Sequence, residues 1–177
     1  MPRTVQPQDA KDACWILEYL IHDLVVARQL YDLSSDIGKR VTVHPETEKA
    51  VRRMYISHLL LALAKFYEFY GKYSWLLPEP QKTKCRAIQK ELTRRKVRDL
   101  RNTFIGHVLN KKTGRPISNA DIDAAFNAAT NHDVHAFLRW IHVSGDTASP
   151  NSVVGALEAA HAELRKLHAI LKPTVEF

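Results

Sequence analysis

This 177-residue sequence has few of the residues that interrupt helices or cross-link chains. Six glycines and eight prolines leave room for long uninterrupted helices. The only cysteines, Cys14 and Cys85, are too few for a disulfide scaffold or a four-thiolate metal site, and we expect both as reduced thiols in apolar faces. The apolar run LLLALA at 59–64 is far shorter than a membrane span. These shortages favour an all-α fold without a membrane partner.

The amino-terminal stretch MPRTVQPQDAKDA also lacks the apolar segment of a signal peptide, so we expect a cytoplasmic protein. Hydrophobic residues make up 45% of the chain and charged residues 25%, which is typical of a globular protein and unlike a disordered one. The length suits one domain with a sizeable core, so we predict a single domain over residues 1–177.

The formal net charge is +7, from 26 Lys and Arg against 19 Asp and Glu. A surplus of this size suits an anionic partner such as RNA, because Lys and Arg contacts to phosphates release condensed counterions. Net charge of either sign also serves plain solubility. Charge alone therefore leaves both interpretations open.

Two long segments show apolar residues at the three- and four-residue steps of a helix. The first runs from about Asp9 to Ser34, with its stripe at Trp15, Ile16, Tyr19, Leu20, Leu24, Ala27 and Leu30. The segment SSDIGKRVTVHPE, which contains Gly38, is predicted to be a loop. Pro45 opens the second helix, with its stripe at Val51, Met54, Tyr55, Leu59, Ala62, Phe66, Phe69 and Tyr73.

A third helix is predicted from about Gln81 through Val108, ended by NKKTGRP. Ser118 and Asp121 resemble a capping box that opens a short helix, and HDVHAFLRWIHV predicts another. Ser149-Pro150 predicts the start of the last helix, which runs to about Leu171. The pattern indicates a helical bundle of about four long helices with one or two short ones.

The stretch RDLRNTFIGHVLNKK, residues 98–112, carries three polar residues that could do chemistry: Arg101, Asn102 and His107. On an ideal helix, His107 lies about 20° from Leu100 and Arg101 about 100° from it. This places His107 on the apolar stripe and Arg101 at its edge. By itself, a histidine on an apolar stripe is more often a packed core residue, and an arginine at the edge of a stripe is more often solvated.

Together, the residues LRNTFIGH, Leu100 to His107, resemble the motif of the HEPN superfamily of helical RNases, in the "LRN…H" form of its abortive-infection branch. The resemblance implies a HEPN-like fold, a symmetric homodimer whose motif helices face each other across a cleft, and metal-independent RNA cleavage without a cofactor. It also implies a defence or toxin–antitoxin setting, with an antitoxin protein as a possible partner. Two copies can bring together groups that one helix holds apart.

The resemblance assigns a role to each motif residue. His107 would move the proton of a ribose 2′-OH, Arg101 would hold the scissile phosphate, and Asn102 would orient one of these groups or the RNA. The products would be a 2′,3′-cyclic phosphate and a 5′-hydroxyl. Leu109 stands where one branch has a modified tyrosine, so that mode of control is not expected. Basic residues beside the motif are expected along the RNA backbone: Arg94, Arg95, Arg98, Lys111 and Lys112.

Two other hypotheses remain: a catalytically inactive HEPN-like bundle that serves as a binding or dimerisation module, and an unrelated bundle in which Arg101 and His107 are structural. A metal site is disfavoured, because carboxylates do not follow at ligand spacing near His132, His135 and His142, and the Glu-x-x-His pairs of bundle metal sites are absent around Glu18, His22 and His58. His161 and His168 are expected to border a packing face. The tryptophans are expected in the core rather than as base-stacking platforms: Trp15, Trp75 and Trp140.

Overall fold

The computed structural model describes residues 4–40, 42–104, 114–143 and 149–171. These ranges form seven α-helices and a short 3-10 helix, Ser74–Leu76, and they contain no β-strand. The prediction of an all-α helical bundle is confirmed. Within the same ranges, no helix combines the length and the apolar character that crossing a membrane requires.

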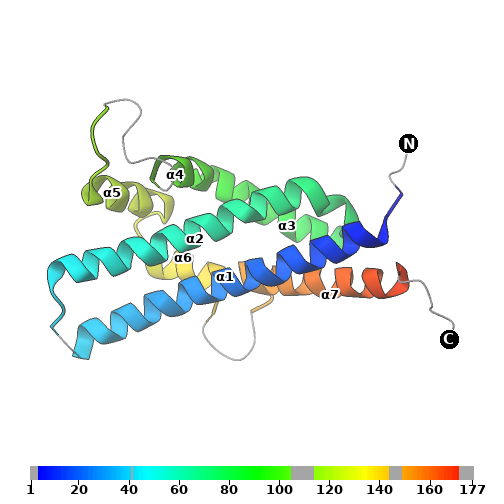
Figure 1. Cartoon of the computed structure of the whole chain (residues 1–177), viewed down its shortest axis with the longest axis horizontal. Helices are drawn as coiled ribbons and strands as arrows, with labels where there is room; N and C mark the ends of the chain where they lie inside the picture. Colours follow the sequence, from blue (N-terminus) through cyan, green and yellow to red (C-terminus); the bar gives the residue numbers. More distant parts are fainter. Residues whose placement is uncertain (1–3, 41, 105–113, 144–148, 172–177) are drawn as a thin grey trace.

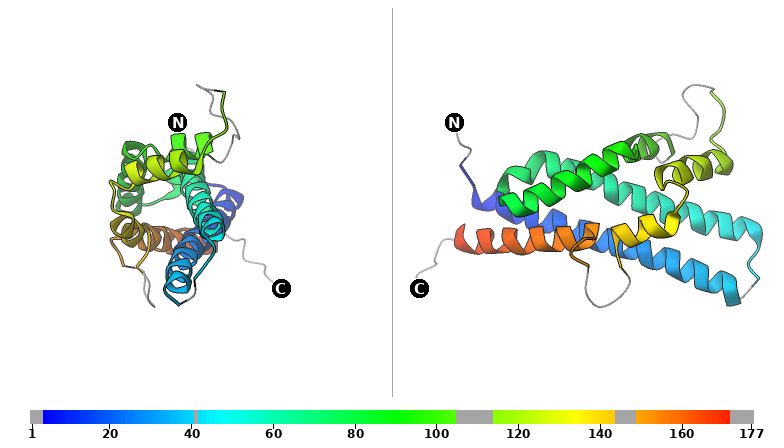
Figure 2. Two further views of the ribbon diagram at one scale, coloured as in Figure 1. Left: turned by 90° about the vertical axis from the view of Figure 1, so that its left-hand side faces the viewer. Right: turned by 180° about the vertical axis from the view of Figure 1, so that it is seen from behind.

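The two longest helices, α1 (Pro7–Arg40) and α2 (Pro45–Tyr73), form an antiparallel pair along the length of the molecule (Figure 1). The last helix, α7 (Val153–Leu171), packs along α1 on its other side (Figure 2). The third long helix, α3 (Glu79–Arg94), contacts both α2 and α7. Four long helices therefore enclose the core.

Three short helices complete the fold. α4 (Val97–Phe104) and α5 (Asn119–Ala129) contact α2 and each other, whereas α6 (Val134–Ile141) contacts α1 and α7. The predicted capping box is present at the start of α5, where the Asp121 backbone N–H donates to Ser118 Oγ and the Ser118 N–H donates to the Asp121 carboxylate. The LLLALA segment of α2 is buried almost throughout, as its lack of polar residues predicts.

Two helix boundaries differ from those expected. α1 continues through Gly38 to Arg40, because a glycine in an exposed last turn costs only about 1 kcal/mol and does not end a helix by itself. α7 begins at Val153, three residues after Pro150. Its cap is Ser152, whose Oγ accepts a hydrogen bond from the Gly155 N–H at 3.0 Å, while Ser149 and Pro150 lie in the preceding turn.

The predicted third helix is two helices, and this corrects the expected continuous helix from Gln81 to Val108. Lys96 has a φ of 54°, in the left-handed region, so α3 ends at Arg94 and α4 begins at Val97. The turn allows Val97 to be fully buried and the Arg95 side chain to reach α5. Phe104 is the last described residue of α4, and the part of the prediction over residues 105–113 lies outside the described residues.

Three apolar side chains assigned to core stripes are exposed. Trp15 is 63% exposed, Tyr19 54% and Met54 52%. Leu20, Leu24 and Ala27 of the expected α1 stripe are buried, and the rest of the buried face is formed by Ala10, Ala13 and Leu17 in place of Trp15 and Tyr19. Trp75 and Trp140 pack partly buried against the core, as expected, so the correction concerns Trp15 alone among the tryptophans.

Candidate functional site

α4 is anchored by its apolar side and carries the first part of the motif near its carboxyl end. Val97 is fully buried, and Leu100 packs half-buried against the core. The Leu100 N–H donates to the Lys96 carbonyl at 3.1 Å, which joins the new helix to the turn before it. Because one face of α4 packs against the core, Arg101 and Asn102 lie on an anchored helix at the protein surface.

Arg101 and Asn102 interact directly. Arg101 Nη1 donates a hydrogen bond to Asn102 Oδ1 at 3.0 Å. Asn102 is exposed and Arg101 half-buried, and within the described ranges no carboxylate pairs with the Arg101 guanidinium. The amide holds one edge of the guanidinium, which leaves its other N–H groups for an anion such as a phosphate.

The remaining motif residue, His107, lies outside the described residues, as do Lys111 and Lys112. The helical projection that placed His107 on an apolar stripe assumed one continuous helix. The convergence of Arg101 and His107 on one phosphate therefore stays a prediction.

The three other basic residues assigned to RNA occupy different environments. Arg98 is exposed and pairs with no carboxylate of the described chain. Arg94 is exposed but holds Glu91 with two hydrogen bonds, of 2.8 and 2.6 Å. Arg95, whose side chain is only 13% exposed, donates to Glu91 Oε1 at 2.7 Å and to the Ala129 carbonyl at 2.7 Å, and its guanidinium lies over the Phe137 and Trp140 rings.

Glu91 is the acidic centre of this arginine cluster. The pKa of Glu91 is lowered to about 2. The hydrogen bond from Arg94 is the largest cause; burial raises the pKa by less than this bond lowers it, and the hydrogen bond from Arg95 lowers it further. Glu91 is therefore ionised at every physiological pH. It compensates part of the positive charge next to the motif, whereas Lys96, Arg98 and Arg101 pair with no carboxylate of the described residues.

Tyr67 is a further hydroxyl beside this surface that the sequence did not single out. Its Oη lies 3.0 Å from Thr93 Oγ1, near the end of α3. The pKa of Tyr67 is raised, mainly by burial. The Thr93 hydrogen bond and Arg98 oppose this shift, and Asp99 adds to it, so Tyr67 interacts with charged residues of α4. In the sequence Tyr67 is one of several aromatic residues at core spacing, so no signal distinguished it.

The histidines considered for a metal site are dispersed. His135 lies 3.3 Å from the Tyr31 hydroxyl, His142 is buried, and His132 is exposed in a left-handed turn. Among the described residues, no group of three or more His, Cys, Asp and Glu side chains could hold a metal ion. His161 and His168 line a groove between α1 and α7.

Comparison with known proteins yields a structural likeness. The chain matches no protein-family model and no curated protein sequence. It is similar in structure to the integron cassette protein Vpc_cass2 from the mobile metagenome of V. paracholerae, with a TM-score of 0.75 and 20% sequence identity over 92% of this chain and 99% of the other. At this identity the likeness establishes a shared helical fold.

Proposed function

We propose that this protein is an endoribonuclease of the HEPN type, which cleaves RNA by attack of a ribose 2′-OH. The observation that carries the proposal is the Arg101–Asn102 pair, an arginine fork oriented by an amide on the exposed side of an anchored helix. A group of this kind can bind a phosphate bidentately and stabilise the charge that grows on it in the transition state. The sequence LRNTFIGH supplies His107 as its partner.

In the proposed reaction, His107 accepts the proton of the 2′-OH while the 2′-oxygen attacks the adjacent phosphorus. The bond between phosphorus and the 5′-oxygen breaks, and the leaving oxygen takes up a proton. Arg101 donates hydrogen bonds to the non-bridging oxygens, where negative charge accumulates. The products are a 2′,3′-cyclic phosphate and a 5′-hydroxyl, and none of these steps requires a metal ion.

Two protomers would form the cleft. The RNA backbone would pass Arg98 and Arg94, with Lys111 and Lys112 beyond the motif, whereas Arg95 is largely buried and already bonds Glu91 and the Ala129 carbonyl. We place this activity in the cytoplasm, in a defence or toxin–antitoxin setting in which a second protein restrains it.

The test compares the purified wild type with Arg101→Ala and His107→Ala on end-labelled RNA in the presence of EDTA. We expect each variant to lose at least about a hundredfold in cleavage rate, since each removes a transition-state contact or the proton-transfer group. Matched controls are Arg139→Ala and His22→Ala, which remove exposed residues on α6 and α1. DNA of the same sequence should be inert, because it has no 2′-OH.

Equal activity in the wild type and both motif variants would overturn the proposal. A second candidate is a binding or dimerisation module without catalysis, and the pairing of Arg94 and Arg95 with Glu91 favours it by reducing the charge available to RNA. That candidate predicts RNA or protein binding by the wild type, with no cleavage in EDTA or in Mg²⁺.

A further inference from the structure

The positive charge of the chain is concentrated on α3, α4 and the turn between them. Residues 79–104 contain nine Lys and Arg against three Asp and Glu, whereas the rest of the chain contains 17 against 16. This segment therefore holds six of the seven surplus positive charges. Its two helices follow each other along one side of the bundle (Figure 2). A surface of this kind attracts a polyanion.

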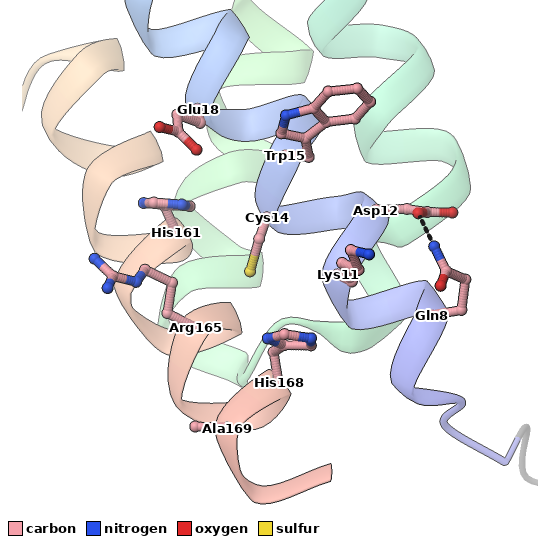
Figure 3. Close-up of a pocket in the computed structure, with 10 residues that line it drawn as sticks. All are labelled: Gln8, Lys11, Asp12, Cys14, Trp15, Glu18, His161, Arg165, His168 and Ala169. Atoms are coloured by element: carbon pink, nitrogen blue, oxygen red, sulfur yellow. Dashed lines mark hydrogen bonds between the residues drawn. The ribbon is translucent and has the colours of Figure 1, made fainter. Parts of the chain in front are cut away.

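The groove of about 860 Å³ between α1 and α7 differs in its charge. Lys11 and Arg165 stand there on opposite sides of Cys14 (Figure 3). The carboxylates of Asp12 and Glu18 line the same groove and balance their charge. Because opposite charges alternate along this groove, it does not suit a polyanion as the surface of α3 and α4 does.

The basic residues of α3 recur every four residues on its outward side. The opposite side of the helix is buried, at Cys85, Ile88 and Leu92. Arg86, Lys90 and Arg94 point away from it, each about 40° further round an ideal helix than the one before. All three are exposed. They form a basic stripe along α3, which continues on α4 with Arg98 and Arg101.

Carboxylates neutralise only part of the stripe. Lys90 forms no hydrogen bond or ion pair with another described residue. Arg86 makes a side-chain hydrogen bond to Tyr70, and Glu79 acts on it through charge alone. Of the three, Arg94 is the one that a carboxylate holds, that of Glu91. The charges of Arg86 and Lys90 are therefore available to phosphates.

Tyr67 connects the two parts of the stripe across the turn between α3 and α4. Its Oη lies 3.0 Å from Thr93 Oγ1, on the outward side of α3. Burial raises the pKa of Tyr67 and Arg98 on α4 opposes this shift, so Thr93 and Arg98 both lie beside the same tyrosine. Arg101 follows Arg98 by about one turn, on the same side of α4. The stripe therefore leads to the Arg101–Asn102 pair.

We propose that the stripe on α3 binds the RNA backbone on one side of the scissile phosphate, with phosphates at Arg86, Lys90 and Arg94. The inference rests on the proposed cleavage activity for the place of the scissile phosphate, at Arg101. From Arg86 to Arg94 the helix rises about 12 Å, which is longer than one nucleotide. The preferred substrate is therefore an RNA chain that extends well beyond the cleaved bond.

The first test measures binding of a single-stranded RNA of about 20 nucleotides by fluorescence anisotropy, with full-length His107→Ala so that the RNA stays intact. Arg86→Ala and Lys90→Ala, each added to this variant, should weaken binding about three- to tenfold. Each should also lower the slope of log affinity against log salt concentration by about 0.7, the value for one phosphate contact to a single strand.

Lys84→Ala is the matched control, because it removes the same charge from the same exposed helix. Lys84 lies on another side of α3, in a hollow that Trp140 and Asn151 also line. The Lys84→Ala variant should change the affinity by less than about twofold, since an exposed charge off the track is screened by salt.

The second test measures cleavage by the otherwise wild-type chain. Lys90→Ala should raise KM for the long RNA several-fold and leave kcat unchanged, because Lys90 binds the substrate away from the reacting phosphate. The dinucleotide UpA has a single phosphate, which Arg101 would hold, so its kcat/KM should be the same in Lys90→Ala as in the wild type.

The inference is overturned if Lys84→Ala weakens RNA binding as much as Arg86→Ala and Lys90→Ala do, or if neither stripe variant changes the affinity or the salt slope. A polyglutamate peptide that binds as tightly as the RNA at the same salt concentration would also overturn it and would indicate an acidic protein partner.

The two proposals fail separately. RNA binding that depends on Arg86 and Lys90, without cleavage by the wild type, would refute the proposed activity and leave the RNA-binding stripe. Cleavage of the long RNA that Arg101→Ala abolishes, but that Arg86→Ala and Lys90→Ala leave unchanged at low substrate concentration, would refute the stripe alone.

Discussion

At the scale of single residues, Arg95 connects three helices through one side chain. It leaves the end of α3, pairs with Glu91 on the same helix, donates to the Ala129 carbonyl at the end of α5 and lies over two rings of α6. A guanidinium can make all these contacts at once because it is planar and has five donors. The same contacts hold the backbone at the turn between α3 and α4, and thereby the orientation of α4.

We expect Arg95→Ala to lower the free energy of unfolding by about 2–4 kcal/mol, since it takes away the donor of the Ala129 carbonyl, one of the two arginines that hold Glu91, and the packing on two rings of α6. Arg95→Lys should recover little, because an ammonium cannot reach both oxygens and stack on the rings. Urea denaturation measures both. Arg94→Ala is the control: it shares Glu91 but its side chain is 57% exposed, so its loss should stay below about 1 kcal/mol. Equal losses in Arg94→Ala and Arg95→Ala would refute the structural role of Arg95.

His142 gives the protein a predicted sensitivity to mild acid. It is 9% exposed, and its Nδ1 has no hydrogen-bond partner among the residues that the structure describes. The pKa of His142 is lowered, mainly by burial. Arg28 on α1 lowers it further, whereas Glu158 on α7 and Asp32 on α1 oppose the shift. The unfolded chain therefore binds more protons at this histidine than the folded one, so stability is complete above the unfolded pKa of about 6.5 and is lost as pH falls toward the folded pKa.

The free energy of unfolding should accordingly decrease as pH is lowered from about 7.5 to about 5, and His142→Gln should reduce this dependence, leaving the part that comes from His161, whose pKa burial also lowers. Glu91 does not interfere, because its lowered pKa of about 2 puts its own loss of stabilisation below about pH 4.5. The same slope in His142→Gln as in the wild type would assign the effect to other groups.

At the scale of elements, two helical glycines differ in the space around them. Gly155 lies in the first turn of α7, where a Cβ would stand 2.2 Å from the Ser149 carbonyl oxygen. Gly71 lies near the end of α2, exposed, and a Cβ there would meet nothing within 4 Å. The first glycine permits the close approach of the turn that precedes α7, and the second only adds backbone freedom to a helix.

The same substitution should therefore have opposite signs at these positions. Gly155→Ala should destabilise the protein by about 2–4 kcal/mol, because backbone must move to admit the methyl group. Gly71→Ala should stabilise it by up to about 1 kcal/mol through helix propensity. Melting temperatures of the two variants provide the measurement, and a stabilised Gly155→Ala would mean that α7 starts differently.

The positions of the helices could be predicted from the sequence, but two helix boundaries could not: the start of α7 and the break between α3 and α4. The reasons differ. Ser149-Pro150 satisfies the local rule for a helix start, but Ser152 offers the same hydroxyl three residues later and caps α7 instead. The break at Lys96 is not marked in the sequence by a proline or a glycine. It arises from contacts of Arg95 and Val97 with helices far away in the chain, which local patterns do not contain.

At the scale of the whole molecule, the proposed reaction requires two chains. If each cleft uses groups from both protomers, mixing Arg101→Ala with His107→Ala should give mixed dimers that retain one Arg101 and one His107. We expect cleavage well above that of either variant alone, together with a dimer mass in sedimentation equilibrium. A monomeric wild type, or no gain on mixing after subunit exchange, would show that each chain acts alone.

The sequence singled out Arg101 and Asn102 because they belong to a short contiguous motif, and their catalytic role stays a prediction. It did not reveal the groove between α1 and α7, whose walls come from opposite parts of the chain. Trp15 was assigned to the core because Trp15, Tyr19 and the leucines of α1 share helical spacing. Only the positions of α2 and α7 decide that Leu17 faces inward and Trp15 outward.

The packing of α7 against α1 also has a consequence for biosynthesis. During translation, α1 leaves the ribosome long before α7, and the leucines and alanines that α7 covers stay open to solvent until then. A nascent chain that ends before Val153 cannot close this side of its core. Folding is therefore completed only after most of the chain has been made, and unfinished chains should be substrates for chaperones and proteases.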